Sequence, residues 1–523
     1  MFRGFESSSP LLPEIFALHG KWQVRKPALI AGGVRETWPE MMSSSHRVAN
    51  ALIQSGVQVG DAVAIVMSNG AHMVHAFLGC MSAGAVSVPI NLSVSDDALV
   101  NMLIDAKTVA LLVTGDQFER IVNLQTRLPS TLSVCVTTGT ESEPGWAVWD
   151  EFISGVADTA PNINIEDDAI LNVIYSSGTT GVPKGIVHTH RGRRDWAYDL
   201  AIALRYHGAA KSLFTIGLYS NISWVSMLAT LLAGGTLVVH DKFDEAVFLD
   251  TVARERITHT AMVPIQFQRV TDLQLAEPRN VSSMTAMMSA GSPLREPLKR
   301  RIFEAFPCGI IELYGLTEGI ITTLDPEDAE GRWSSVGRPL IGTDIAIIDD
   351  EGRGVPVGTS GEIVSRGRIT MPGYLNRADA SQESEYIDAN GQQWLRSGDI
   401  GQLDDEGFLY IVDRKKDMIL SGGQNIYPQD IEAVVALHET VYDVAVIGAP
   451  SERWGETPIA LVVPTPGVTL CDDCRAAIRT FANERLGKQQ RIADVIAVTE
   501  LPRNPNGKIL KRELRAQFTH LHY

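Results

Sequence analysis

The chain has 523 residues, of which 45% are hydrophobic and 20% are charged, so it can bury a large core without disulfide or metal staples. Its formal charge of −17, from 45 Lys and Arg against 62 Asp and Glu, argues against nucleic acid or an anionic membrane surface as the main partner. Five mostly scattered cysteines argue against a secreted disulfide framework. The length predicts roughly three folding units of about 150 residues each.

The N-terminus and the apolar segments predict a cytoplasmic protein without a membrane span. MFRGFESSSP lacks the basic start and apolar core that a signal peptide needs. The longest apolar stretches, residues 76–90 and 225–239, are shorter than the roughly 20 residues that cross a bilayer.

Short apolar runs alternate with longer amphipathic stretches through the first two-thirds of the chain. This alternation is typical of an α/β fold with parallel strands, in which ligands gather beyond the carboxyl ends of the strands. The expected helices are residues 38–55 and 244–256, and the expected strands are residues 62–69, 110–114, 236–240 and 258–264.

From about residue 340 hairpins replace this alternation. Residues 344–367 contain two strand runs bridged by turn residues, and residues 400–414 form a second hairpin that turns at Asp405-Glu406-Gly407. A charged segment then leads into an α+β unit, with a helix opened by Pro428 and strands at 441–450 and 458–464. We expect a domain boundary at about 414–417, between an N-terminal domain of residues 1–414 and a mobile C-terminal domain of residues 417–523.

Cys471 and Cys474 form a C-x-x-C pair at the start of a further expected helix. No second Cys or His pair stands nearby in the sequence, which favours two cysteines on one helix face. A metal or redox role is the alternative.

The segment YSSGTTGVPKGIVHTH, residues 175–190, carries the strongest functional signal, and it follows an apolar strand run at 170–174. Its glycines let backbone N–H groups point at phosphate oxygens, its hydroxyls add neutral donors, and Lys184 adds a mobile cation. The predicted polyphosphate cradle consists of Ser176, Ser177, Gly178, Thr179, Thr180, Gly181 and Lys184.

A Walker-type P-loop is one rival interpretation of this segment. It requires Gly five residues after Gly178, then Lys, then Ser or Thr. Pro183, Lys184 and Gly185 stand at those positions, so the fit fails at two of the three. A flexible surface loop is the other alternative.

The loop resembles the phosphate-binding loop of the adenylate-forming (ANL) superfamily of acyl-CoA synthetases, firefly luciferases and peptide-synthetase adenylation domains. The resemblance extends over nearly the whole chain, because further family motifs recur in the same order. It implies a large N-terminal domain of α/β subdomains with a β-barrel-like portion, hinged to a small α+β C-terminal domain. The chain looks most similar to bacterial feruloyl- and fatty-acid-type CoA ligases.

Two motifs resemble the family's adenine and metal sites. SAGSPL (289–294) resembles the segment that borders the adenine, and in ELYGLTEG (312–319) the resemblance implies that Tyr314 stacks on adenine, Thr317 donates to the α-phosphate and Glu318 holds Mg²⁺. A carboxylate beside a polyphosphate requires a divalent cation between them. Taken alone, the octapeptide is equally an ordinary strand and turn with a core tyrosine. The implied nucleotide contacts here are Ala290, Gly291, Ser292, Glu312, Tyr314, Gly315 and Thr317.

The resemblance also assigns the ribose site and the hinge. Asp399 in WLRSGDIG would accept hydrogen bonds from the ribose hydroxyls, and Arg414 would be the second ribose contact. Lys416 stands at the family's hinge position, for which a solvated linker residue is the alternative.

The coenzyme A site is expected in the C-terminal domain. SGGQNIYP (421–428) resembles the strand that lines the pantetheine tunnel, where small residues let a thin chain pass close to the backbone. The candidates are Ser421, Gly422 and Gly423, with Trp454 as a further contact or a packed surface residue.

PRNPNGKILKREL (502–514) resembles the C-terminal catalytic motif. It implies that Lys508 reaches the carboxylate and the α-phosphate, in a catalytic set with Lys184, Thr317 and Glu318. A solvated tail lysine is the alternative. The Asn506-Gly507 turn and the apolar Ile509 favour a lysine that is held in place.

The acyl pocket is expected around GLYSN (217–221), where many relatives carry a PLFH-like motif. Ser220 or Asn221 stands in place of the family's histidine, which argues against a histidine gate. Tyr219, Ser220, Asn221 and Trp224 are the candidate lining residues, and ordinary core residues are the alternative.

Together these motifs imply an ATP-dependent carboxylic acid–CoA ligase that uses ATP, Mg²⁺ and coenzyme A. It would form acyl-AMP and then acyl-CoA from an aromatic or medium- to long-chain apolar acid, as a monomer or homodimer. The alternatives are a stand-alone adenylation enzyme that loads a carrier protein, a luciferase-like oxygenase, and a non-enzymatic nucleotide sensor. Lys508, Asp399 and Glu318 argue against the sensor.

Overall fold

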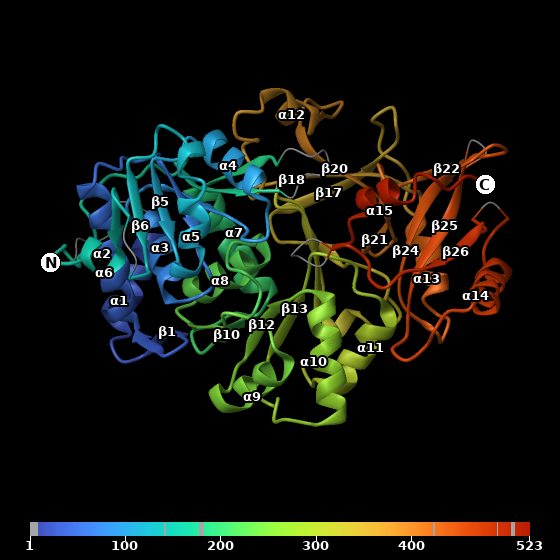
Figure 1. The fold of residues 1–523 in the computed structure, drawn as a ribbon, viewed down its shortest axis with the longest axis horizontal. Coiled ribbons are helices and arrows are strands. Elements are labelled where there is room, and N and C mark those ends of the chain that lie inside the picture. The colour runs from blue at the N-terminus through green and yellow to red at the C-terminus, as the bar shows by residue number, and fades with distance from the viewer. Residues whose placement is uncertain (1–8, 141–142, 177–182, 422–423, 489, 504–507) are drawn as a thin grey trace. The chain divides into compact units, whose positions relative to one another are not determined.

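The computed structural model describes residues 9–140, 143–176, 183–421, 424–488, 490–503 and 508–523 (Figure 1). The chain forms two compact units. Unit 1 comprises Met1–Glu330, Pro339–Asp344 and Arg366–Glu385, and unit 2 comprises Gly331–Arg338, Ile345–Ser365 and Tyr386–Tyr523. Arg414 and Lys416 both lie in unit 2, and the domain boundary at about 414–417 stays a prediction.

A seven-stranded sheet of unit 1 has the order β7-β6-β5-β3-β4-β8-β9. All its pairs are parallel except the hairpin of β8 and β9. Every residue of β3 is buried, as expected for a parallel sheet covered on both faces. The strands are β3 (Ala62–Val66), β4 (Val86–Pro89), β5 (Ala110–Val113), β6 (Val134–Thr137), β7 (Trp146–Val148), β8 (Ile170–Tyr175) and β9 (Gly185–Thr189).

A second sheet of nine strands has the order β16-β15-β14-β13-β12-β10-β11-β1-β2. Its strands run parallel from β1 to β14, and β2 and β15 pair antiparallel at either side. The strands are β1 (Pro27–Ala31), β2 (Val34–Thr37), β10 (Lys211–Phe214), β11 (Thr236–Val239), β12 (His259–Met262), β13 (Ala286–Ser289), β14 (Ile311–Gly315), β15 (Ile321–Leu324) and β16 (Arg338–Pro339).

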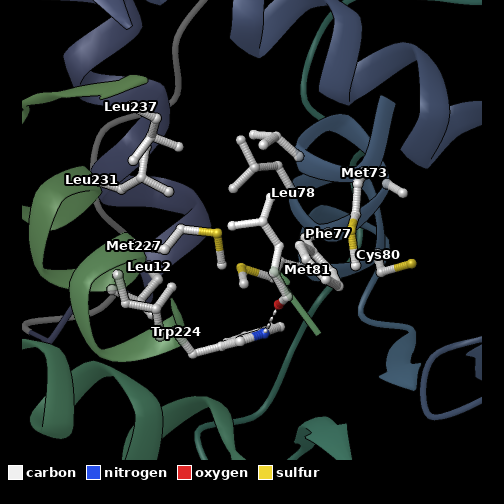
Figure 2. Packing of buried hydrophobic residues seen from close by; sticks show 14 of the residues in the cluster. Leu12, Met73, Phe77, Leu78, Cys80, Met81, Trp224, Met227, Leu231 and Leu237 are labelled. Atoms are coloured by element: carbon white, nitrogen blue, oxygen red, sulfur yellow. Dashed lines mark hydrogen bonds between the residues drawn. The ribbon is translucent and has the colours of Figure 1, made fainter. Parts of the chain in front are cut away.

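The helices α3 (Ala71–Ser82) and α8 (Asn221–Leu232) are apolar on all sides and almost completely buried, so they form part of the core. Figure 2 shows Phe77 of α3 beside Trp224 of α8, with ring centroids 5.0 Å apart. The other helices of unit 1 are α1 (Leu12–Trp22), α2 (Trp38–Gln54), α4 (Asp96–Asp105), α5 (Gly115–Val122), α6 (Trp149–Phe152), α7 (His190–Ala203), α9 (Glu245–Glu255), α10 (Pro264–Ala276), α11 (Glu296–Ala305) and α12 (Ala378–Glu383).

Unit 2 carries most of a five-stranded sheet with the order β17-β18-β20-β19, in which β21 also pairs with β20. It contains both expected hairpins, and Gly407 (φ +82°) lies in the turn of the second. The strands are β17 (Thr343–Ile348), β18 (Gly361–Gly367), β19 (Glu385–Ile387), β20 (Gln393–Leu403) and β21 (Leu409–Arg414).

The last part of the chain folds as a second five-stranded sheet with helices. Its strand order is β23-β22-β25-β24, and β26 pairs with β25. The elements are β22 (Ile419–Ser421), β23 (Gln424–Ile426), β24 (Val441–Ser451), β25 (Gly455–Pro464), β26 (Asp494–Ala497), α13 (Pro428–Val435), α14 (Asp472–Arg485) and α15 (Lys511–Gln517).

The fold class predicted from the sequence is confirmed: the chain combines a large α/β portion with a small α+β portion. The strands expected around residues 62–69, 110–114, 236–240 and 258–264 are β3, β5, β11 and β12. Asp244 caps α9 by accepting from the Val247 N–H at 2.9 Å, which explains the start of that expected helix. No helix of the described residues combines the length and apolarity that a membrane crossing needs.

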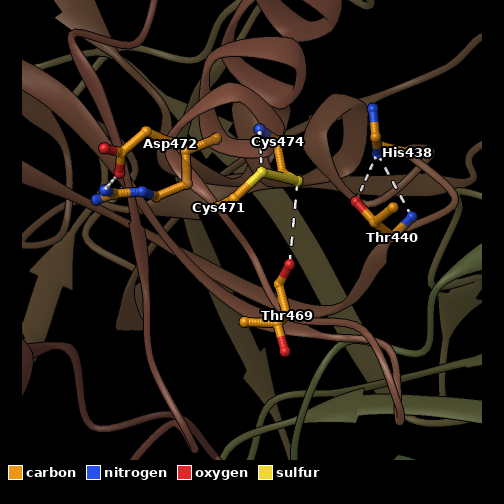
Figure 3. The surroundings of a disulfide bond; sticks show 7 residues. His438, Thr440, Thr469, Cys471, Asp472 and Cys474 are labelled. Atoms are coloured by element: carbon orange, nitrogen blue, oxygen red, sulfur yellow. Dashed lines mark hydrogen bonds and ion pairs between the residues drawn. A yellow bond between two sulfur atoms is a disulfide. The ribbon is translucent and has the colours of Figure 1, made fainter.

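The expectation of two cysteines on one helix face, without a redox role, did not include the link that the structure shows between them. Cys471 caps the N-terminus of α14, and the structure joins it to Cys474 by a disulfide (Figure 3). The Cys471 sulfur also accepts from the Cys474 backbone N–H at 3.3 Å. The capping turn brings the two side chains together, which residue spacing alone did not indicate.

Candidate active site

The expected phosphate loop joins β8 to β9. Tyr175 pairs with Gly185 across this hairpin, and the Ser176 N–H donates to the Lys184 carbonyl at 2.9 Å. Ser176 and Lys184 therefore stand opposite each other at the base of the loop. The predicted contacts Ser177, Gly178, Thr179, Thr180 and Gly181 lie outside the described residues.

Next to Lys184, at the foot of the loop between β8 and β9, Tyr374 connects two of the predicted catalytic side chains. Its hydroxyl donates to Glu318 Oε1 at 2.9 Å, and Lys184 Nζ lies 4.9 Å from the centroid of its ring. Burial and the charge of Glu318 raise the pKa of Tyr374, so the phenol stays protonated and remains a donor. The structure thus brings Lys184 and Glu318 to one place.

Glu318 lies in the tight turn between β14 and β15. The Leu316 N–H donates to the Ile320 carbonyl at 2.9 Å, which closes the turn. At Gly319 (φ +122°) an added Cβ would lie 2.5 Å from the Thr370 Cα, so only glycine fits. The turn fixes the positions from which Thr317 and Glu318 project.

The expected adenine segment and this turn follow the carboxyl ends of two neighbouring strands of the nine-stranded sheet. Neighbouring parallel strands β13 and β14 pair Ser289 with Glu312, so Ala290, Gly291 and Ser292 follow one strand where Tyr314 and Gly315 end the other. Ligands bind beyond the carboxyl ends of parallel strands. The two predicted groups of nucleotide contacts are therefore neighbours.

Glu312, a predicted nucleotide contact, is buried and forms an ion pair with buried Lys299 of α11. Its Oε1 also accepts from the Leu294 N–H at 3.3 Å. Burial raises the pKa of this carboxyl, and the Lys299 charge opposes that rise. These contacts indicate that Glu312 positions the segment after β13.

Replacing Lys299 with methionine is expected to lower the free energy of unfolding by about 3–5 kcal/mol, because the Glu312 carboxylate would stay buried without its cation. A carboxyl whose pKa is raised by folding stabilises the protein at low pH and loses that effect as pH rises through the folded pKa. The decrease in the free energy of unfolding that Lys299→Met causes should thus be larger at pH 8 than at pH 5. Thermal unfolding at both pH values measures it, and the Lys299→Met/Glu312→Gln double variant should recover much of it. An equal loss at both pH values would contradict this explanation.

In unit 2, the predicted ribose contacts face each other across two strands. Asp399 of β20 pairs with Arg414 of β21, and Arg414 Nε lies 3.3 Å from Asp399 Oδ1. Asp399, Arg414 and Lys416 line one pocket of about 330 Å³. The strand pairing therefore gathers two anticipated ribose contacts and the anticipated hinge residue.

Lys508 belongs to the same cluster as Asp399, Arg414 and Lys416. Its ammonium interacts electrostatically with Arg414, Lys416, Asp399 and Asp417. Burial and the two neighbouring cations lower its pKa to about 7. The site is thus poised to hold an anion, which would restore the charge of the lysine.

The backbone around Lys508 explains how a residue near the chain end is held. Arg503 pairs with Ile509 in an antiparallel bridge, and the Leu510 N–H donates to the Pro502 carbonyl at 2.8 Å. Ile509 packs against the cluster that contains Leu501 and Leu514. The turn residues Asn506 and Gly507 lie outside the described residues.

The family of the chain is decided by comparison with known proteins. Residues 17–375 match the family model of the AMP-binding enzyme, and residues 430–508 match the AMP-binding enzyme C-terminal domain. The chain belongs to the AMP-binding enzyme family. The resemblance to adenylate-forming enzymes is thereby confirmed.

Relatives of this AMP-binding enzyme match it along almost its whole length. It is 32% identical over 488 residues to the long-chain-fatty-acid–CoA ligase FadD13 of Mycobacterium tuberculosis, covering 93% of this chain and 94% of that protein. It is 31% identical over 512 residues to a feruloyl-CoA synthase of Amycolatopsis sp, covering 95% and 99%. The solved o-succinylbenzoate CoA synthetase (MenE) of Bacillus subtilis, in complex with the acyl-adenylate intermediate, has a TM-score of 0.81 at 28% identity and covers 96% and 97%.

Two candidate coenzyme A contacts of this AMP-binding enzyme, Ser421 and Trp454, are brought together by the pairing of β22 with β25. Ser421 of β22 is buried and pairs with Gly455, directly after Trp454. The Trp454 side chain is 41% exposed, and the Arg453 guanidinium lies 4.7 Å from its ring centroid. Gly422 and Gly423 lie outside the described residues.

The candidate acyl-pocket residues surround the start of α8. Ser220 caps the helix by accepting from the Ile222 N–H at 3.3 Å, and Tyr219 is partly buried. Trp224 is fully buried, and its Nε1–H donates to the Leu218 carbonyl at 3.0 Å (Figure 2). Asn221 accepts a hydrogen bond from Arg193 at 2.9 Å.

Sequence reasoning missed Tyr374, Arg193 and Lys299 of this AMP-binding enzyme. Tyr374 and Lys299 act through contacts with Glu318 and Glu312, and no local motif marked them. Arg193 belongs to the arginine-rich run RGRR that directly follows residues 175–190, and such a run is more typical of solvated side chains.

Proposed function

We propose that this protein is an ATP-dependent carboxylic acid–CoA ligase. It first forms acyl-AMP and pyrophosphate from the acid and ATP, and then acyl-CoA and AMP. The observation that carries the proposal is the placement of Lys508 with Asp399 and Arg414. A ribose held by that pair would bring the attached α-phosphate close to the Lys508 ammonium.

The chemistry requires such a cation. A carboxylate is a poor electrophile, and its attack on ATP first brings two anions together. Lys508 and Lys184 would offset this repulsion and stabilise the charge that develops at the α-phosphate. Thr317 would add a neutral donor. Breaking the bond between the α- and β-phosphates releases pyrophosphate and leaves an acyl carbon with a good leaving group.

The second half-reaction consumes this adenylate. The coenzyme A thiol, as its thiolate, attacks the acyl carbon, and AMP leaves with the bonding electron pair. Ser421, Gly422, Gly423 and Trp454 are the proposed coenzyme A contacts, and Lys416 is the proposed hinge between residues 1–414 and 417–523. The pairing of Ser421 with Gly455 supports a common surface for the first and last of these contacts.

Mg²⁺ is the metal that the chemistry of the site fits. Magnesium typically takes one or two carboxylates plus substrate phosphates rather than an all-protein cage. Glu318 offers one carboxylate, which Tyr374 orients through a single hydrogen bond of 2.9 Å. Bound there with ATP, the ion would neutralise phosphate charge.

The acid is proposed to be aromatic or a medium- to long-chain apolar acid. Tyr219 and Trp224 place aromatic rings at the start of α8, and two relatives are named for a long-chain fatty acid and a feruloyl product. The second candidate function, transfer of the acyl group to a carrier protein, shares the first half-reaction.

The test is incubation of the protein with ATP, MgCl₂, coenzyme A and a panel of aryl, branched and straight-chain acids. AMP and acyl-CoA are measured, and kcat/KM is compared across the panel. Formation of both products in equal amounts, only when acid is present, supports the ligase. Acid-dependent pyrophosphate exchange without acyl-CoA would favour the carrier-loading alternative. Absence of both would refute the proposal.

A further inference from the structure

Arg193 of α7 is a buried cation without a carboxylate partner among the described residues. Only 2% of its surface is exposed. The other buried cations in the described part of the chain are paired: Arg194 with Asp195 at 3.2 Å, and Lys299 with Glu312. A buried charge is costly unless an opposite charge compensates it, so Arg193 requires an explanation.

Within the part of the chain that the structure describes, only neutral groups contact the Arg193 guanidinium. Its Nε–H donates to Asn172 Oδ1 at 3.0 Å and one Nη–H donates to Asn221 Oδ1 at 2.9 Å. Its Cζ lies 4.4 Å from the ring centroid of Trp196 and 5.3 Å from that of Trp224. These contacts fix the orientation of the side chain but leave its charge uncompensated, and burial lowers its pKa to about 9.

Arg193 lines a narrow cavity of about 10 Å³, whose other walls include His188, Thr317, Thr370 and Met371. This is the space for about one water-sized group, such as a single carboxylate oxygen. His188 Nε2 and Thr370 Oγ1 have no hydrogen-bond partner within the described residues. Residues that carry a cation and unsatisfied polar atoms therefore line one small space.

The position of this cavity indicates which ligand would enter it. Thr317 is the proposed α-phosphate contact, and Asn221 and Trp224 are proposed acyl-pocket residues. An anion bound at Arg193 would lie between the acid pocket and the phosphorus atom that the acid attacks. The substrate acid is the reactant that brings an anionic oxygen to this place.

We propose that Arg193 is a carboxylate-binding residue of the acid site. This rests on the proposed function as an acid ligase. A guanidinium forms strong, directional, charge-assisted hydrogen bonds to a carboxylate oxygen. The carboxylate is either the reacting group or the second group of a dicarboxylic acid.

The test compares Arg193→Gln and Arg193→Lys with wild type. The matched control is Arg194→Gln, which removes a buried arginine of the same helix that already has acid partners. Acyl-AMP formation is measured by pyrophosphate release on monocarboxylic and dicarboxylic acids of equal length. Thioester formation from supplied monocarboxylic acyl-AMP and thermal unfolding are measured in parallel.

For Arg193→Gln we expect the KM for the acid to rise about 10- to 100-fold, the effect of losing a charged hydrogen-bonding partner. The KM for ATP and thioester formation from supplied acyl-AMP should change little, because this adenylate has no free carboxylate. Arg193→Lys should recover part of the loss. Arg194→Gln should lower the unfolding temperature without raising the KM for the acid.

The pattern across acids identifies the carboxylate. A higher KM for monocarboxylic acids assigns Arg193 to the reacting group. A loss confined to dicarboxylic acids assigns it to the second group. Unchanged KM values, or an equal loss in both half-reactions with a lower unfolding temperature, would overturn the proposal and leave Arg193 as a link between α7, β8 and α8.

The design separates failure of this proposal from failure of the proposed function. Wild-type turnover tests the function alone. If wild type converts no acid, binding of the same acids in the presence of α,β-methylene-ATP is measured by calorimetry. That analogue occupies the nucleotide site but cannot release pyrophosphate. Weaker acid binding to Arg193→Gln would then still support the carboxylate site, and equal binding would refute it.

Discussion

Replacing Lys508 with alanine is expected to lower the rate of acyl-AMP formation by about 10²–10³-fold, the usual effect of removing one preorganised group that stabilises transition-state charge. Thioester formation from supplied acyl-AMP should be spared, because no second anion then approaches the α-phosphate. Single-turnover measurements of pyrophosphate release and of acyl-CoA formation separate the two steps.

The matched control for this variant is Lys488→Ala, which removes an exposed lysine of unit 2. It should leave both half-reactions unchanged. An equal loss of both half-reactions in Lys508→Ala would show that Lys508 merely supports the fold.

The lowered pKa of Lys508, about 7, predicts a pH-dependent effect on stability. A lysine whose pKa falls on folding destabilises the native state while pH is below the folded pKa, and this penalty fades as pH rises toward the unfolded value. Lys508→Met should therefore raise the unfolding temperature of the nucleotide-free protein at pH 6 more than at pH 10. A uniform change at both pH values would contradict the burial of a charged ammonium.

The second large effect is expected at Glu318. Glu318→Gln keeps the shape of the side chain and removes its charge, so acyl-AMP formation should fall about 10²-fold and half-maximal activity should need more Mg²⁺. Tyr374→Phe removes only the orienting hydrogen bond and should cost about 10-fold. Pyrophosphate release titrated with MgCl₂ measures both.

Glu330→Gln, at an exposed position of unit 1, is the control for the Glu318 variant. It should retain the wild-type response to Mg²⁺. A Glu318→Gln enzyme with unchanged Mg²⁺ dependence would remove this carboxylate from the metal site.

Local signals in the sequence predicted much of the fold. The uninterrupted apolar run AVAIV forms β3 because both faces of a parallel strand are buried. Asp244 ahead of an amphipathic stretch marked the start of α9. Asp399 and Arg414 stood in motifs, and the hairpin between them explains why they meet.

The remaining features depend on contacts that no local pattern encodes. The Tyr374–Glu318 hydrogen bond joins residues 56 positions apart, and the Lys299–Glu312 pair depends on the packing of α11 against the sheet. Burial of Arg193 could not be read from its sequence, since an arginine in a basic run is usually solvated. The disulfide of Cys471 depends on the capping turn of α14.

The buried ion pair of Lys299 and Glu312 connects two segments at one edge of the nine-stranded sheet. Glu312 belongs to β14, and through Oε1 it also holds Leu294, in the segment that follows β13. The segment that follows β13 and the strand that leads to Thr317 are thus held together by a single carboxylate. Loss of Lys299 should therefore weaken the binding of ATP under conditions in which the chain is still folded.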